Sequence, residues 1–212
     1  MKIAIIGAGN VGGALGTRWA HAGHHVTFGV RDPRDPDTLA LAHSLGPTAH
    51  VASVAEAART APIVVLATPW PATKEAIGAC GDLVGKTVVD CTNPLSGDAS
   101  SLTIGHTTSG AEEIAKWAKG AHVVKAFNQT GAENMASQEG YSVHPVMFVA
   151  GDDATRKKDV ISLARDAGFE AQDLGPLASA RLLEPLAMLW ITLAYRQKLG
   201  RDFAFALLRR RK

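Results

Sequence analysis

The stretch MKIAIIGAGNVGGALGTRWAHAGHHVTF, residues 1–28, decides the fold. Its apolar run over 1–6 has the length of a strand, and residues 7–12 fit the pattern G-x-G-x-x-G. A helical stretch follows, Gly23 ends it, and an apolar segment over 25–28 predicts a second strand. This order of strand, glycine turn, helix and strand is the setting in which the pattern binds a dinucleotide. The stretch therefore predicts the first βαβ unit of a dinucleotide-binding fold.

Each glycine of the pattern has its own expected role. Gly7 permits the tight turn out of the strand, Gly9 lets a pyrophosphate approach the backbone, and Gly12 lets the helix pack on the strand. Asn10 and Val11 begin the helix, whose first N–H groups attract phosphate. We expect these five residues to bind the cofactor; the alternative is a glycine turn that binds no ligand.

The rest of the chain alternates strand-like and helix-like segments, which predicts an α/β fold with a mainly parallel, doubly wound sheet of the Rossmann type. We expect a Rossmann domain over 1–176 and a small C-terminal helical extension over 177–212, helical as far as residue 208, that carries the acceptor site and dimer contacts. Further strands are expected at 50–51, 62–67, 86–91, 121–126, 145–150 and 170–173.

Composition limits the partners and the compartment. The 212 residues carry a net charge of +2, which gives no drive toward nucleic acid. The two cysteines lie outside any C-x-x-C pair, and the N-terminus has no signal-peptide pattern. The apolar stretch over 186–195 is too short to span a bilayer. We therefore expect a cytoplasmic protein without membrane contact. The histidines have no metal-ligand spacing, so no metal site is expected. The C-terminal helix is apolar on nearly every side, which predicts a homodimer or a helix packed on its own sheet.

Arg31 predicts which dinucleotide binds. NAD-binding proteins place an acid at the end of the second strand, whereas NADP-binding proteins supply arginine for the 2′-phosphate. Here Gly29 would leave room, Arg31 follows the strand, and Arg34 could add a second cation. Asp32 is the competing residue, since a register shift by one would put it in the acidic position. The sequence favours NADP(H) over NAD.

Later motifs carry a family resemblance. They are T-P-W at 68–70, D-C-T-N-P at 90–94, V-V-K-A-F-N at 123–128, G-D-D at 151–153 and D-L-G-P-L-x-x-A-R at 173–181. Together with the glycine motif, they resemble the NADP oxidoreductases that use the deazaflavin coenzyme. The same pattern is similar to the cytosolic domain of the six-transmembrane (STEAP) metalloreductases. The resemblance covers nearly the whole chain, and N-P after one strand with K-A-F-N after the next is its most specific part.

The resemblance implies hydride transfer between NADPH and a deazaflavin or flavin. It implies a cofactor or acceptor role for residues at the carboxyl ends of three strands, where ligands of open α/β sheets bind. The expected cofactor contacts are Thr68, Pro69, Trp70, Asn93 and Pro94, and the expected acceptor contacts are Lys125, Phe127 and Asn128. Structural alternatives remain open. Pro69 and Pro94 could simply end strands, Phe127 could be a core residue, and Lys125 could form a surface ion pair.

The chain departs from the family pattern in two ways. Val30 stands where these proteins often have serine or threonine, which removes one hydrogen bond to the 2′-phosphate. No transmembrane domain follows the reductase unit, so we do not expect haem-linked metal reduction.

No catalytic side chain is required, because the cofactors carry hydride chemistry while the protein positions them. Cys91 and His106 are candidates for a contact with the reacting rings, without a clear pattern. Two alternatives stay open. An imine or carbonyl reductase would need a proton donor, for which Lys125 or Tyr141 could serve. A non-catalytic NADPH-binding redox sensor would need none.

Overall fold

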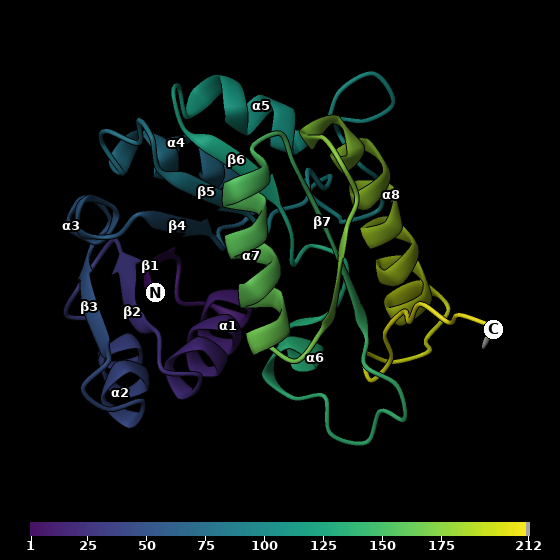
Figure 1. Cartoon of the computed structure of the whole chain (residues 1–212), viewed down its shortest axis with the longest axis horizontal. Coiled ribbons are helices and arrows are strands. Elements are labelled where there is room, and N and C mark those ends of the chain that lie inside the picture. The colour runs from purple at the N-terminus through teal and green to yellow at the C-terminus, as the bar shows by residue number, and fades with distance from the viewer. Residues whose placement is uncertain (211–212) are drawn as a thin grey trace.

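A single eight-stranded sheet runs through the molecule (Figure 1), with strand order β3-β2-β1-β4-β5-β6-β7-β8. The computed structural model describes residues 1–210. All neighbouring strands are parallel except β6 and β7, which pair antiparallel. Helices connect the strands, so the predicted Rossmann-type, mainly parallel α/β fold is confirmed.

The elements alternate along almost the whole chain. The strands are β1 (Lys2–Ile6), β2 (His25–Val30), β3 (Ala49–Ser53), β4 (Ile63–Leu66), β5 (Thr87–Asp90), β6 (His122–Lys125), β7 (Val146–Gly151) and β8 (Glu170–Asp173). The helices are α1 (Asn10–His21), α2 (Pro36–Ser44), α3 (Val54–Thr60), α4 (Trp70–Ala79), α5 (Gly110–Trp117), α6 (Ala132–Ala136), α7 (Ala154–Asp166) and α8 (Ala180–Ile191). Short turns flank α8: the 3₁₀ turn η1 (Leu177–Ser179) and the π-helical turn η2 (Thr192–Arg196).

Two apolar cores cover the two faces of the sheet. Alternate strand residues point to opposite faces, so Ile5 belongs to one core and its neighbours Ala4 and Ile6 to the other. Helices α1, α2, α6 and α7 contribute to the first core, while α3, α4, α5 and α8 contribute to the second. Both faces are therefore covered, as parallel sheets require.

Strand β1 lies between β2 and β4, which makes it the switch point of the sheet. From there the chain winds outward in both directions, so a crevice opens at the carboxyl ends of β1 and β4. Ligands of doubly wound sheets bind in such crevices. The glycine motif follows β1 directly and therefore lies at this crevice.

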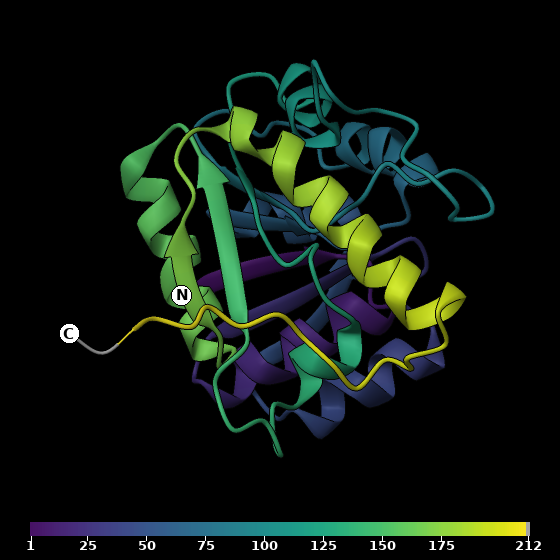
Figure 2. The same cartoon turned by 90° about the vertical axis from the view of Figure 1, so that its right-hand side faces the viewer.

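The C-terminal part differs from the sequence expectation. Helix was expected as far as residue 208, but it ends at Arg196, and residues 197–210 form an irregular strap that crosses the molecule (Figure 2). The strap is held by tertiary contacts instead of helical ones. The indole of Trp190 stacks on Phe203 at 5.3 Å between ring centres and donates a 2.9 Å hydrogen bond to its carbonyl. The Phe205 carbonyl accepts from the Val146 amide, at the start of β7.

Helix α8 and its flanking turns form a 20-residue helical stretch, Leu177–Arg196. Its length and composition would suffice to cross a membrane, which is weak evidence because buried core helices meet the same criterion. One side of α8 packs on the domain through Leu183, Ala187 and Trp190. The opposite side is open, with Leu182 66% and Leu189 49% exposed. The apolar composition had suggested a helix covered on every side, but one side of α8 is exposed in this chain.

Candidate functional site

The glycine motif forms a tight loop between β1 and α1. Gly7 has a φ of +100°, and a Cβ there would lie 2.9 Å from the Ala67 carbonyl oxygen. A Cβ on Gly12 would lie 1.9 Å from the Gly7 carbonyl oxygen. The protein itself requires these two glycines. A Cβ on Gly9 would meet no atom within 4 Å, so packing alone does not explain why this position has no side chain.

The N-terminus of α1 is open to a ligand. Gly9 is the N-cap and forms no side-chain capping bond, and the first turn contains no acidic residue. Asn10 and Gly9 are both exposed, whereas Val11 packs against the core below. The first N–H groups of a helix carry a partial positive charge and seek an acceptor. The loop therefore fits a dinucleotide pyrophosphate, with Gly9 leaving the space that the phosphates would occupy.

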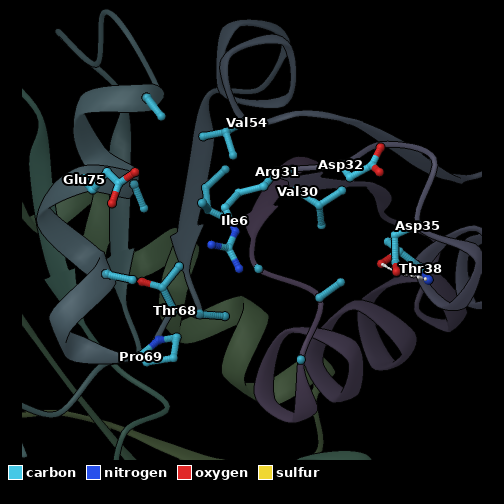
Figure 3. A pocket seen from close by; sticks show the side chains of 18 of the residues that line it. Ile6, Val30, Arg31, Asp32, Asp35, Thr38, Val54, Thr68, Pro69 and Glu75 are labelled. Atoms are coloured by element: carbon cyan, nitrogen blue, oxygen red, sulfur yellow. Dashed lines mark hydrogen bonds between the residues drawn. The ribbon is translucent and has the colours of Figure 1, made fainter.

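A pocket of about 960 Å³ extends from this loop (Figure 3). The ends of β1, β2 and β4 form its floor, and the beginnings of α2 and α3 and one face of α4 form its walls. The lining residues are Ile6, Gly7, Ala8, Gly9, Gly29, Val30, Arg31, Asp32, Asp35, Asp37, Thr38, Val54, Ala67, Thr68, Pro69, Ala72, Glu75, Ala76 and Ala79.

Arg31 reaches into this pocket from the end of β2 (Figure 3). It forms no ion pair with any residue in the range 1–210 and is exposed. Arg34 does not line the pocket: its Nε lies 3.2 Å from Asp32 Oδ1, and both side chains are exposed. The Asp32 carboxylate is thus engaged by Arg34, which leaves Arg31 as the available cation for a 2′-phosphate.

The sequence suggested that Gly29 leaves room for the nucleotide. In the structure, this glycine is required mainly by packing inside the protein. A Cβ there would lie 2.8 Å from the Ile6 side chain and 3.0 Å from Ala57. These are core neighbours from β1 and α3, so Gly29 is required by the packing of α3 on the sheet. Its role is structural even though its backbone borders the pocket.

Replacing Arg31 with alanine should weaken NADPH binding about 30-fold and leave NADH binding nearly unchanged, because only NADPH offers a phosphate for a charge-assisted pair. Arg34→Ala is the matched control: it removes the same charge from a residue already paired with Asp32. Fluorescence titration of both variants with both nucleotides measures the effect. Equal losses of affinity for NADPH and NADH in Arg31→Ala would contradict the assignment of Arg31 to the 2′-phosphate.

The expected contacts after β4 separate into two groups. Thr68 and Pro69 line the pocket, and Thr68 Oγ1 lies 3.0 Å from Thr73 Oγ1. Trp70 does not line it: its ring lies 5.4 Å from that of Trp117 and packs between α4 and α5. The tryptophan is therefore placed to hold two helices together, away from the pocket.

Asn93 and Asn128 join the carboxyl ends of β5 and β6. Asn93 donates to the Asn128 backbone carbonyl at 2.9 Å, and the Asn128 amide donates to Asn93 Oδ1 at 2.9 Å and to the Leu183 carbonyl at 3.0 Å. Asn128 is 5% exposed, and its Oδ1 has no partner among the described residues. Pro94 is buried beside this pair. The pair fixes the edge of the sheet that the resemblance assigns to the nicotinamide ribose and the acceptor.

Lys125 is placed differently from the expectation. Its side chain is fully buried, and Nζ donates to Asp90 Oδ2 at 2.8 Å, Glu184 Oε1 at 3.0 Å and the Thr92 carbonyl at 2.6 Å. All three N–H groups are thus used inside the protein, and none is free for an acceptor. The expected contact with the acceptor and the alternative, a surface ion pair, both differ from this buried geometry.

The carboxylates around Lys125 have further partners. Glu184 accepts the Gly110 and Ala111 amides at the start of α5 at 2.9 and 3.2 Å, and Asp90 accepts from Thr92. Burial by itself would lower the pKa of Lys125, but the two carboxylates outweigh it and raise the pKa above its usual value. We name the group Lys125, Asp90 and Glu184 the buried ionic cluster; it ties β5, β6, α5 and α8 together.

Phe127 belongs to the core, which was the alternative for this residue. It is 1% exposed and meets Trp19 edge to face at 5.5 Å. Its φ of +61° turns the chain sharply after β6. Cys91 is buried as well, and burial, with a smaller effect of Asp90, raises the pKa of its thiol. His106 is exposed in the loop over 95–108.

Two residues of this region were not predicted from the sequence. The first is Glu184, which completes the buried ionic cluster; a lone acid in an apolar helix was the signal available in the sequence. Glu75 was not singled out, although it lines the pocket on α4. Its signal was the spacing of Ala72, Ala76 and Ala79 around it, a helix face of small residues.

The fold and the glycine-loop pocket define a dinucleotide-binding protein of the Rossmann type, and comparison with known proteins gives the family. Residues 2–94 match the family model of NADP oxidoreductases that depend on coenzyme F420. A solved structure from Arthrobacter sp. FB24, assigned as an F420-dependent NADP reductase, is 33% identical with a TM-score of 0.88, over 99% of this chain and 100% of that one. The chain belongs to the coenzyme F420-dependent NADP oxidoreductase family.

Two more distant relatives are informative. The metalloreductase STEAP3 of Rattus norvegicus is 32% identical over 88% of this chain, which corresponds to 36% of the length of that relative. A reductive aminase of Aspergillus terreus, solved with NADPH and ethyl levulinate, has a TM-score of 0.67 at 22% identity over 93% of this chain and 62% of its own. The second likeness shows the shared fold alone.

Proposed function

We propose that this chain transfers hydride between NADPH and a deazaflavin or flavin. The observation that carries the proposal is the pocket at the switch point, where the start of α1 and an arginine without an ion-pair partner among residues 1–210 lie in one cavity. Family membership supports the reaction class. The metalloreductase relatives are much longer than this chain, so their whole activity is not transferred to it.

The side chains and amides of the pocket would bind and orient the nucleotide. The open N-terminus of α1 and Gly9 would hold the pyrophosphate, and Arg31 would pair with the 2′-phosphate. Thr68 and Pro69 would border the nicotinamide ribose. When bound, the cofactor supplies the hydride, and the protein contributes position and electrostatics. The buried ionic cluster would keep the ends of β5 and β6 rigid beside the acceptor.

Steady-state oxidation of NADPH with the deazaflavin coenzyme, FMN and FAD in turn tests the reaction. We expect turnover with at least one of the three. Tight NADPH binding without turnover of any acceptor would contradict the oxidoreductase proposal and favour a redox sensor. Parallel assays of NADPH oxidation with a cyclic imine and with a ketone test the remaining alternative, an imine or carbonyl reductase.

An imine or carbonyl reductase is the second candidate, and the reductive aminase with the same fold keeps it under consideration. Such an enzyme needs a proton donor near the acceptor atom. Both candidates from the sequence are engaged elsewhere: Lys125 in the buried ionic cluster, and Tyr141, whose hydroxyl donates to Asn134 at 2.7 Å. Burial, with Asp202 nearby, raises the pKa of Tyr141 and favours its neutral form. This geometry favours flavin-type acceptors, which need no such donor.

We also propose that the chain forms a homodimer through the outer side of α8. Leu182 and Leu189 are both exposed on that side. Apolar residues grouped on one side of a helix favour a protein contact. Analytical ultracentrifugation at micromolar concentration should give twice the mass of the chain, and a monomeric mass would contradict the dimer.

A further inference from the structure

One face of α4 forms a wall of the pocket, and it has an unusual composition. The residues of α4 that line the pocket are Ala72, Glu75, Ala76 and Ala79, spaced as one helical face. Three are alanines, so this wall is smooth and apolar. Glu75 is its single hydrogen-bonding side chain, and Figure 3 shows it on α4 while Arg31 reaches into the pocket from the end of β2.

The Glu75 carboxylate is without a polar partner in the described part of the chain. Among residues 1–210 it forms no ion pair and no side-chain hydrogen bond, and it is exposed to the pocket. Of the other three carboxylates that line the pocket, Asp32 is engaged by Arg34 at 3.2 Å and Asp35 by Thr38 at 2.6 Å, whereas Asp37 lies on a different wall, in the first turn of α2. Those bonds turn two acids toward their own loop. Glu75 remains as the unpaired acid in the lining that comes from α4.

We propose that Glu75 determines base specificity by accepting a hydrogen bond from the exocyclic amino group of adenine. The inference rests on the proposed binding of NADPH in this pocket. With the pyrophosphate at Gly9 and the 2′-phosphate at Arg31, the base has the space between the end of β2 and the alanine face of α4. A flat ring fits against a wall without bulky side chains.

The chemistry of the two purine types makes the prediction directional. An ionised carboxylate only accepts hydrogen bonds, and adenine presents an N–H₂ donor at its 6-position. Hypoxanthine presents a carbonyl oxygen at the same place, which a carboxylate repels. Glu75 therefore favours adenine and disfavours the 6-oxo purine. Because the side chain is exposed, we expect discrimination of about tenfold, at the lower end for a hydrogen bond to a charged group.

Titration with NADPH and with deamino-NADPH, its hypoxanthine analogue, tests this inference through nicotinamide fluorescence, which both ligands share. The unmodified protein should bind NADPH about tenfold more tightly. In Glu75→Gln the ratio should fall to about one, since an amide can both donate and accept. Glu139→Gln is the matched control, because Glu139 is exposed and lies outside the pocket. That variant should keep the original ratio.

The outcomes distinguish this inference from the proposed function. Normal NADPH binding with an unchanged ratio in Glu75→Gln would overturn the role of Glu75 alone. Tighter binding of NADPH but not of NADH in Glu75→Gln would place the carboxylate against the 2′-phosphate, which also overturns it. Failure of the unmodified protein to bind either ligand would reject the NADPH pocket and this inference together.

Discussion

Gly9→Ala should fold normally and bind NADPH about 100-fold more weakly. A Cβ at this position meets no protein atom within 4 Å, and the φ of −72° and ψ of −163° are allowed for alanine. The methyl group would instead occupy the space over the open N-terminus of α1, where the pyrophosphate has to approach. Losing two charge-assisted hydrogen bonds at about 1.5 kcal/mol each accounts for the expected factor.

Thermal unfolding and fluorescence titration together measure this effect. The melting temperature should stay within about 2 °C of the unmodified protein, because no contact is lost and none is strained. Gly78→Ala is the matched control: Gly78 lies on α4, also has no atom within 4 Å of a Cβ, and does not line the pocket. Equal NADPH affinities for the two variants would show that the glycine loop does not hold the phosphates.

Lys125→Met should lower the free energy of unfolding by about 3–5 kcal/mol, the cost of leaving buried carboxylates without their cation. Asp90 and Glu184 are both fully buried, so neither could recover hydration. Urea denaturation measures the change. Lys116→Met is the control, since Lys116 is an exposed lysine whose pair with Glu113 contributes at most about 0.5 kcal/mol. Similar losses for the two variants would contradict the description of the cluster.

The same cluster gives a pH dependence with a definite sign. Burial opposes the charge of Lys125, but the two carboxylates outweigh it and raise the pKa of Lys125 above the usual lysine value of 10.5. Because the pKa is raised on folding, the contribution of Lys125 to the free energy of unfolding is complete below pH 10.5. It is lost as the pH rises through the higher pKa of the folded protein. Lys125 should therefore contribute no pH dependence to stability between neutral pH and pH 10.

The first βαβ unit could be predicted from the sequence because its signals are local. An apolar strand, three spaced glycines and a helix follow one another, and each glycine restricts the backbone or the packing within a few residues. Gly7 and Gly12 are indeed required by close contacts with Ala67 and with the loop itself. Arg31 at the end of β2 and Thr68 after β4 line the pocket for the same reason: strand ends converge at one edge.

The role of Lys125 could not be predicted, because its partners are far away in the chain. Glu184 is 59 residues distant, and only the packing of α8 on α5 brings its carboxylate to the lysine. A lysine after a strand looks the same in the sequence whether it contacts a ligand or a buried acid. Trp70 illustrates the same limit, because its placement depends on Trp117 of another helix.

The C-terminal strap could not be predicted for a different reason. Residues 197–210 are apolar enough to continue the helix, but the backbone carbonyls of Phe203 and Phe205 accept hydrogen bonds from groups far away in the chain. Asn134 donates to the Phe203 carbonyl at 2.8 Å, and Val146 to that of Phe205. Arg209 pairs with Glu170 at the start of β8. Tertiary contacts of this kind override helix propensity and leave no periodic pattern in the sequence.

Isothermal titration calorimetry with NADPH and NADP⁺ tests the central claim most directly, namely that the pocket beside the glycine loop binds a phosphorylated dinucleotide. We expect one site per chain with a dissociation constant in the micromolar range, and weaker binding of NADH. No heat with either nucleotide at millimolar concentration would contradict the account.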